Sequence, residues 1–217
     1  GPKKSLKTSL MIDAGVALAT GGQFLGRFKV PEAKRVAVLS GESGWGTIQE
    51  TANRICAAAG RNLADLANLI WSDRLPQIGD LRHAAFLRTF CTDNEVEVVF
   101  IDPVYLCMDG ADASNLMVQG PKLRMLSELC GEIGVTPVLL HHSKRSRAAH
   151  LDPYGPLELG DIAWAAFPEF ARQWLLINRF DEYEAGSGVH RLWVGVGGSA
   201  GHDGLWGVEI DEGQQND

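Results

Sequence analysis

The first nine residues carry the side chains and the spacing that could bind a phosphate. They match the pattern GxxxxGK[ST] at Gly1, Lys7 and Thr8, and they depart from it at Leu6, where a glycine is expected. In such a loop, backbone N–H groups at a helix N-terminus point at the phosphates of a nucleotide. The lysine reaches the β- and γ-phosphates, and the threonine hydroxyl ligates Mg²⁺. The segment therefore predicts a nucleoside triphosphatase. Its candidate phosphate-binding residues are Gly1, Pro2, Lys3, Lys4, Ser5, Leu6, Lys7, Thr8 and Ser9.

Two acidic residues follow apolar runs that have the character of buried strands. Asp102 ends the run VEVVFI, where a carboxylate can position Mg²⁺ beside the phosphates. The alternative for Asp102 is a turn cap before Pro103. Glu42 follows the run RVAVLS and could polarise the attacking water as a general base. The alternative for Glu42 is a solvated loop acid.

A histidine pair and a basic loop follow a third apolar run, TPVLL. One of His141 and His142 could sense the γ-phosphate through a hydrogen bond, or both could be ordinary strand-end histidines. The sequence shows no convincing set of further ligands that would make the pair a metal site. Beyond the pair, Lys144, Arg145 and Arg147 could contact a nucleic-acid backbone, with salt-dependent affinity, or could form a solvated charged surface.

Arg179 lies at the end of the apolar run in residues 173–178. An arginine at a strand end could reach the γ-phosphate bound by a neighbouring subunit, as arginine fingers do in phosphoryl-transfer enzymes. The alternative is a surface salt bridge with Asp181 or Glu182, which contributes about 0–1 kcal/mol.

The elements that must position these residues alternate along the chain. We expect strands at 35–40, 68–72, 96–101 and 136–140, and helices at 7–20, 47–59, 81–91 and 118–133. Thr47 and Glu50 suggest a capping box at the start of the second helix, and Gly21-Gly22 suggests the end of the first. This alternation predicts an α/β fold with a mainly parallel sheet covered by helices on both faces. Ligands of such sheets bind beyond the carboxyl ends of the strands, where these candidate residues fall.

The last third of the chain has a different pattern. Residues 172–180, 189–196 and 205–210 read as strands joined by glycine-rich turns, which favours an antiparallel extension of the sheet. Residues 211–217 are polar, and we expect a frayed tail there.

Length, charge and cysteine content limit the kinds of protein that this sequence can encode. A length of 217 residues suits a single domain, and a formal charge of −7 argues against a broadly basic nucleic-acid-binding surface. The four cysteines lack CxxC spacing and suggest reduced, buried thiols in a cytoplasmic protein. The sequence contains no apolar run of about 18 residues, so it predicts no membrane span. Because a phosphate-binding loop normally follows a buried strand, we expect this chain, 1–217, to be one domain that lacks that strand.

Taken in order, the loop GPKKSLKTS, the acid of VLSGESG, the strand end VVFIDP and the segment VLLHHSK resemble RecA-like P-loop ATPases. The resemblance is closest to the branch that contains the hexameric plasmid replicative helicase RepA and its phage and bacterial relatives. It implies that ATP and Mg²⁺ are bound by Lys7, Thr8 and Asp102, and that Glu42 is the catalytic glutamate. It further implies a γ-phosphate sensor at His142, and Arg179 acting across the subunit interface of a homo-oligomeric, hexameric ring. The loop with Lys144, Arg145 and Arg147 would then face single-stranded DNA in the channel.

Two other functions remain open on the residues alone. A KaiC-like regulatory ATPase would use the same core to act on protein partners, without DNA. A P-loop kinase for a small metabolite would use residues 144–147 as a lid, but it would leave Glu42 and Arg179 without roles.

Overall fold

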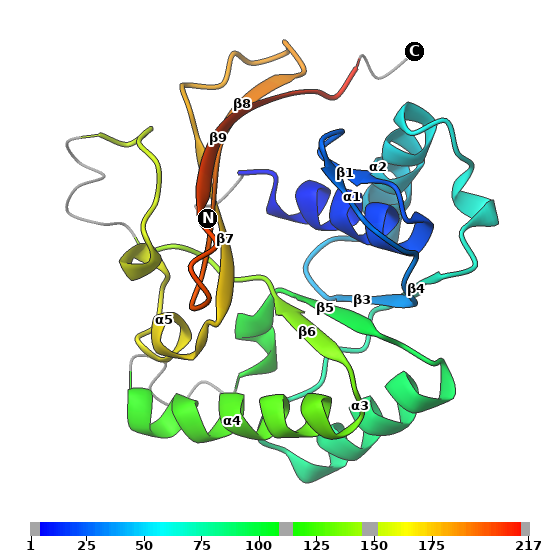
Figure 1. The fold of residues 1–217 in the computed structure, drawn as a ribbon, viewed down its shortest axis with the longest axis vertical. Coiled ribbons are helices and arrows are strands. Elements are labelled where there is room, and N and C mark those ends of the chain that lie inside the picture. Colours follow the sequence, from blue (N-terminus) through cyan, green and yellow to red (C-terminus); the bar gives the residue numbers. More distant parts are fainter. Residues whose placement is uncertain (1–4, 109–114, 145–151, 214–217) are drawn as a thin grey trace. The chain divides into compact units, whose positions relative to one another are not determined.

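The structure is a computed structural model that describes residues 5–108, 115–144 and 152–213. These residues divide into two compact units (Figure 1). One lies within Thr8–Ala113 and Met117–His141 and is called here the parallel-sheet unit. The other lies within Gly1–Lys7, Ser114–Leu116 and His142–Asp217 and is called the antiparallel-sheet unit. The expectation of one domain over 1–217 stays a prediction.

The parallel-sheet unit is built on four parallel strands in the order β4-β3-β5-β6. The strands are β3 (Val36–Ser40), β4 (Leu69–Ser72), β5 (Val98–Asp102) and β6 (Thr136–Leu139). β3, β4 and β6 lie within the predicted stretches, and β5 runs one residue beyond the predicted 96–101, to Asp102. All residues of β3 and all but the first of β5 are buried, as expected for strands covered on both faces.

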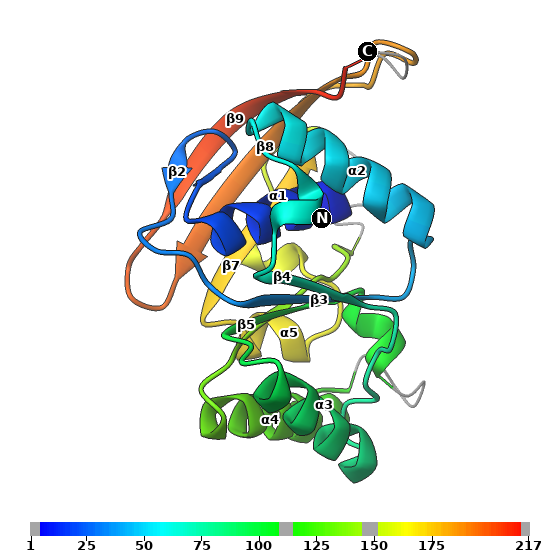
Figure 2. The same ribbon diagram turned by 90° about the vertical axis from the view of Figure 1, so that its right-hand side faces the viewer.

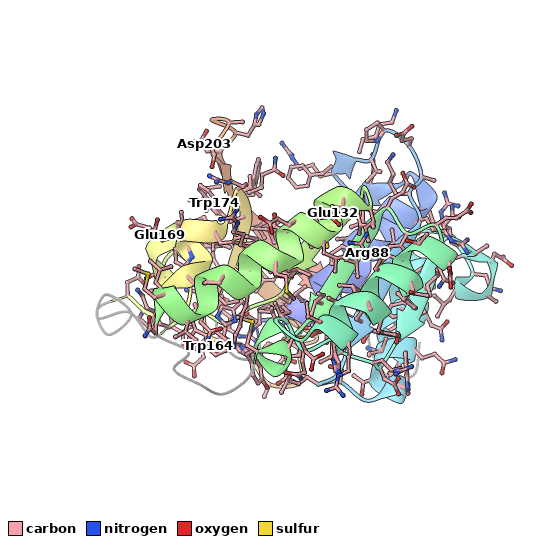
Figure 3. The ribbon with its side chains drawn as sticks, turned by 90° about the horizontal axis from the view of Figure 1, so that it is seen from below. Arg88, Glu132, Trp164, Glu169, Trp174 and Asp203 are labelled. Atoms are coloured by element: carbon pink, nitrogen blue, oxygen red, sulfur yellow. The ribbon has the colours of Figure 1, made fainter. Side chains whose placement is uncertain are left out.

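Helices cover both faces of this sheet, as Figures 1 and 2 show. On one face lie α1 (Lys7–Thr20) and α2 (Trp45–Ala58), and on the other lie α3 (Leu81–Asp93) and α4 (Leu116–Glu132). The ion pair between Arg88 and Glu132 joins α3 to α4, and both side chains are labelled in Figure 3. The predicted α/β fold with a parallel core is therefore confirmed.

Side-chain alternation shows which strand residues point toward α1. Val36 and Val38 of β3 and Phe100 of β5 pack in one core cluster with Ile12 and Val16 of α1. Because side chains alternate between the faces of a strand, the even-numbered residues of β3 and β5 face α1. The last even-numbered residues of these strands are Ser40 and Asp102, which lie side by side in the register.

The antiparallel-sheet unit contains β7 (Gln173–Arg179), β8 (Val189–Gly198) and β9 (Gly204–Asp211), together with the short helix α5 (Ala166–Phe170) and the 3₁₀ turn η4 (Leu159–Asp161). The predicted C-terminal antiparallel strands are confirmed, but among the described residues they form a sheet of their own in the order β7-β8-β9 and do not extend the parallel sheet. The prediction of a frayed tail over 211–217 is wrong at residues 211 and 212, and residues 214–217 lie outside the described residues. Asp211 pairs with Val189, and the N–H of Glu212 donates to the carbonyl of Gly188.

Several local features differ from the sequence prediction. Helix α2 begins at Trp45 after Gly44, so Thr47 lies inside the first turn and the predicted capping box is wrong. Glu50 instead pairs with Arg54 one turn later, at 2.6 Å. The pattern did not reveal the small hairpin of β1 (Gln23–Phe24) and β2 (Phe28–Lys29), nor the 3₁₀ turns η1 (Leu63–Asp65) and η2 (Val104–Cys107). These segments are too short to show a periodic pattern.

The four cysteines, Cys56, Cys91, Cys107 and Cys130, are buried and free of disulfides, as predicted. Burial raises the pKa of Cys91 to about 11 and the pKa values of Cys107 and Cys130 to about 12. These thiols therefore stay protonated at neutral pH and act as small apolar side chains. Within the described part of the chain, no helix is both long enough and apolar enough to cross a membrane.

Candidate active site

The candidate site begins where α1 meets the carboxyl edge of the parallel sheet. Thr8 is the second residue of α1, and its Oγ1 donates a hydrogen bond of 2.9 Å to Oδ2 of Asp102 at the end of β5. Asp102 is 3% exposed. The two residues are 94 positions apart in the sequence, so only the packing of α1 on the sheet brings them together. The first turn of α1 holds no acidic residue that would repel an anion at the helix N-terminus.

Glu42 lies at the same edge, two residues beyond the end of β3. The N–H of Gly41 donates to the carbonyl of Asp102 at 3.0 Å, which ties the start of this loop to the end of β5. Burial raises the pKa of the Tyr105 phenol, and the negative charges of Glu42 and Asp102 raise it further. Both carboxylates therefore act on one neighbouring side chain. Glu42 itself is exposed.

The histidine pair follows β6, and the two residues belong to different units. The N–H of Leu140 donates to the carbonyl of Ile101 at 3.0 Å, so the chain runs beside β5 as far as the residue before His141. This places His141 at the carboxyl edge that carries Asp102. His142 belongs to the antiparallel-sheet unit, where its carbonyl accepts a hydrogen bond from the N–H of Ala163.

The remaining candidate residues are divided between the two units, and several lie outside the described residues. Lys144 is exposed, and its N–H donates to the carbonyl of Asp161 at 2.8 Å. Gly1, Pro2, Lys3, Lys4, Arg145 and Arg147 lie outside the described residues. Ser5 is buried, and Ser9 is half-buried in the first turn of α1.

Arg179 is the last residue of β7, as predicted. Its guanidinium lies 5.2 Å from the centre of the Tyr183 ring, and its Nη1 lies 3.4 Å from Nδ1 of His190. Asp181, one of the predicted salt-bridge partners, pairs with Arg191 at 3.1 Å. The arginine therefore lies beside both of these rings.

The donor atoms at the sheet edge suit Mg²⁺ better than a transition metal. Among the described residues, no group of three or more His, Cys, Asp or Glu side chains could hold a metal ion. Mg²⁺ needs no such cage, because one carboxylate or hydroxyl, phosphate oxygens and water complete its shell. Thr8 and Asp102 supply this kind of oxygen donor next to a helix N-terminus.

A family model described as an AAA domain matches residues 1–148, which is more than half of the chain. The chain belongs to the AAA domain family. The match includes the candidate phosphate-binding segment, Glu42, Asp102 and the histidine pair, whereas the antiparallel sheet lies beyond it. A search of the curated proteins found no match. The AAA domain assigns the chain to the P-loop type of ATPase, which binds ATP.

The structure shows what backbone conformation this AAA domain has at position 6, where it departs from the glycine pattern. Leu6 has a φ of 55°, in the left-handed region that glycine adopts without strain. The backbone at this position therefore has the conformation for which glycine is suited, although the residue is leucine. A left-handed conformation of a non-glycine residue costs about 1–2 kcal/mol.

We expect the Leu6→Gly variant to be more stable than Leu6→Ala by about 1 kcal/mol, because only glycine relieves the strain at a positive φ. Both variants lose the leucine side chain, so their difference isolates the backbone contribution. At an ordinary helical position the order is reversed, and alanine is favoured by about 0.5–1 kcal/mol. Urea unfolding of both variants measures the difference. Equal stability, or a more stable alanine variant, would contradict the left-handed conformation.

Two polar residues of the site were not singled out from the sequence. Tyr105 lies in η2, three residues after Asp102, and Ser40 is the last residue of β3. The available signal for Ser40 was the alternation of β3, which places residue 40 on the same face as residues 36 and 38. No pattern pointed to Tyr105, because a 3₁₀ turn after a strand has no sequence signature as clear as that of a periodic helix.

Proposed function

We propose that this AAA domain hydrolyses ATP in a Mg²⁺-dependent reaction of the RecA-like type, coupled to single-stranded DNA as in the RepA branch of replicative helicases. The observation that carries the nucleotide site is the hydrogen bond between Thr8 and Asp102. It joins the two oxygen donors that a magnesium–triphosphate site requires, at a helix N-terminus and a strand end.

Each residue has a defined part in this proposal. Lys7, the first residue of α1, neutralises the β- and γ-phosphates, while Thr8 and Asp102 hold Mg²⁺. When bound, the ion neutralises charge that develops on the phosphate oxygens. Glu42 accepts a proton from the attacking water, and its exposed position after β3 leaves it open to solvent. His142 senses the γ-phosphate.

The coupling to DNA rests on the basic loop and on the ring. Lys144 is exposed, and with Arg145 and Arg147 it would meet the phosphate backbone of a single strand. Arg179 would act on the nucleotide of a neighbouring subunit in a hexameric ring. Because the net charge is −7, contact with DNA must be confined to this loop and is expected to weaken steeply as salt increases.

The test is ATP turnover with and without single-stranded DNA, measured on the unmodified chain and on Lys7→Ala. We expect slow hydrolysis that DNA accelerates, and no measurable ATP binding by Lys7→Ala, because the phosphates lose their lysine. Lys29→Ala removes an exposed lysine from the β2 hairpin and serves as the matched control. Normal binding by Lys7→Ala would overturn the nucleotide site.

The proposed coupling to single-stranded DNA is tested by a separate experiment. A titration with a fluorescent single strand at low and moderate salt should show binding that falls steeply with salt. ATP hydrolysis without any DNA binding at low salt would overturn the helicase-like role and would favour a KaiC-like regulatory ATPase. Size-exclusion chromatography with Mg·ATP tests the ring, since a monomer under these conditions would contradict it.

A further inference from the structure

Ser40 lies beside Asp102 on the face of the sheet that meets α1. It is the last residue of β3, and the register of β3 and β5 pairs it directly with Asp102. Residues in register on adjacent strands point to the same face. Thr8 of α1 bonds Asp102 on this face, so the Ser40 side chain points into the same layer as the Thr8–Asp102 pair.

The Ser40 hydroxyl is buried without a partner in the part of the chain that the structure describes. Ser40 is 3% exposed, and its Oγ makes no hydrogen bond with any described residue. Burying a hydroxyl without a partner is unfavourable, and such groups are rare in folded proteins. An alanine would fill the same place without this penalty. The hydroxyl therefore calls for a partner that arrives with a ligand.

We propose that Ser40 is a positioning residue of the nucleotide site, whose hydroxyl hydrogen-bonds a water molecule in the hydration shell of the Mg²⁺ held by Thr8 and Asp102. This inference rests on the proposed function. Mg²⁺ gives up its water reluctantly and usually keeps several molecules, which must be oriented by neighbouring oxygen atoms. A hydroxyl can accept from and donate to such a water.

The location of Ser40 favours a metal-bound water over a phosphate. Phosphates bind at the N-terminus of α1, where backbone N–H groups are available. Ser40 instead adjoins the carboxylate of Asp102, which attracts a cation and repels an anion. The residue therefore belongs to the metal side of the site.

The test is a calorimetric titration of Ser40→Ala with ATP, in EDTA and at increasing Mg²⁺. The Mg²⁺ concentration required for half-maximal tightening of ATP binding should rise about three- to tenfold, as expected for the loss of one hydrogen bond. The affinity for ATP in EDTA should be unchanged. The free protein should not lose stability, and its Tm should rise by about 2–4 °C because an unsatisfied buried hydroxyl is removed.

Ser72→Ala is the matched control. Ser72 also ends a strand of this sheet, but it pairs with Leu39 and so lies on the opposite face. Its removal should leave the Mg²⁺ requirement as in the unmodified chain.

Three results would overturn the inference, and they are distinguishable. An unchanged Mg²⁺ requirement in Ser40→Ala, with normal ATP binding by the unmodified chain, removes Ser40 from the site but leaves the proposed function intact. A loss of ATP affinity that is equal in EDTA and in Mg²⁺ assigns the hydroxyl to the nucleotide and not to the metal. If the unmodified chain binds no Mg·ATP, the proposed function itself fails.

Discussion

The Glu42→Gln variant should lose ATP turnover by about 10²–10⁴-fold, the usual contribution of a general base. The amide keeps the shape of the carboxylate but cannot accept the proton of the attacking water. Binding of Mg·ATP should stay within about threefold of the unmodified chain, because the base acts in the transition state and not in the ground state. Single-turnover hydrolysis and equilibrium binding of ATP measure the two effects separately.

Glu50→Gln is the matched control for this experiment. Glu50 lies eight positions further on in α2, and its exposed carboxylate pairs with Arg54. Losing an exposed ion pair of this kind changes stability by about 0–1 kcal/mol and should leave turnover unaffected. Unchanged turnover in Glu42→Gln would remove Glu42 as the base and would direct attention to another group at the same edge of the sheet.

The Thr8→Val variant should weaken the effect of Mg²⁺ on ATP binding by about 100-fold or more, since changes even to the groups that support a metal ligand cost 10–100-fold. Valine has the shape of threonine but lacks the hydroxyl that bonds Asp102 at 2.9 Å. Thr8→Ser keeps the hydroxyl and should retain most of the Mg²⁺ dependence. Calorimetric titrations at several Mg²⁺ concentrations measure the difference between the two variants.

The folding of Thr8→Val must be checked in the same experiment. The substitution removes one hydrogen bond to the buried Asp102, and a bond to a charged group contributes about 1.5–3 kcal/mol. A thermal unfolding curve for both variants shows whether the helix–sheet contact survives. A folded valine variant that needs no more Mg²⁺ than the serine variant would contradict the assignment of Thr8 as a magnesium ligand.

The strands of the antiparallel-sheet unit lie outside the part of the chain that matches the AAA domain. The family match ends at residue 148, before β7, β8 and β9 begin. Arg179 is in this unit, held beside His190 and the Tyr183 ring. Its proposed action on a neighbouring subunit therefore depends on a segment that the family match does not include.

The sequence by itself determined the elements of the parallel core. The runs RVAVLS and VEVVFI are short, apolar and rich in β-branched residues, and this local composition predicted the buried strands β3 and β5. The spacing of Lys7 and Thr8 likewise predicted the start of α1, and Gly21, at a φ of 63°, marks its end. Polar residues directly after apolar runs predicted the carboxyl edge of the sheet, because parallel strands end on the same side.

Only the tertiary structure decided which side chains meet at that edge. Thr8 and Asp102 are 94 residues apart, and neither residue's neighbours in the sequence indicate their contact. The pairing of Ser40 with Asp102 depends on strand register, which is set by the packing of whole strands and not by any local preference. The left-handed backbone of Leu6 also runs against the preference of leucine, so the surrounding fold must impose it. Local sequence preferences thus specified the strands and helices, while long-range packing brought the side chains of the candidate site together.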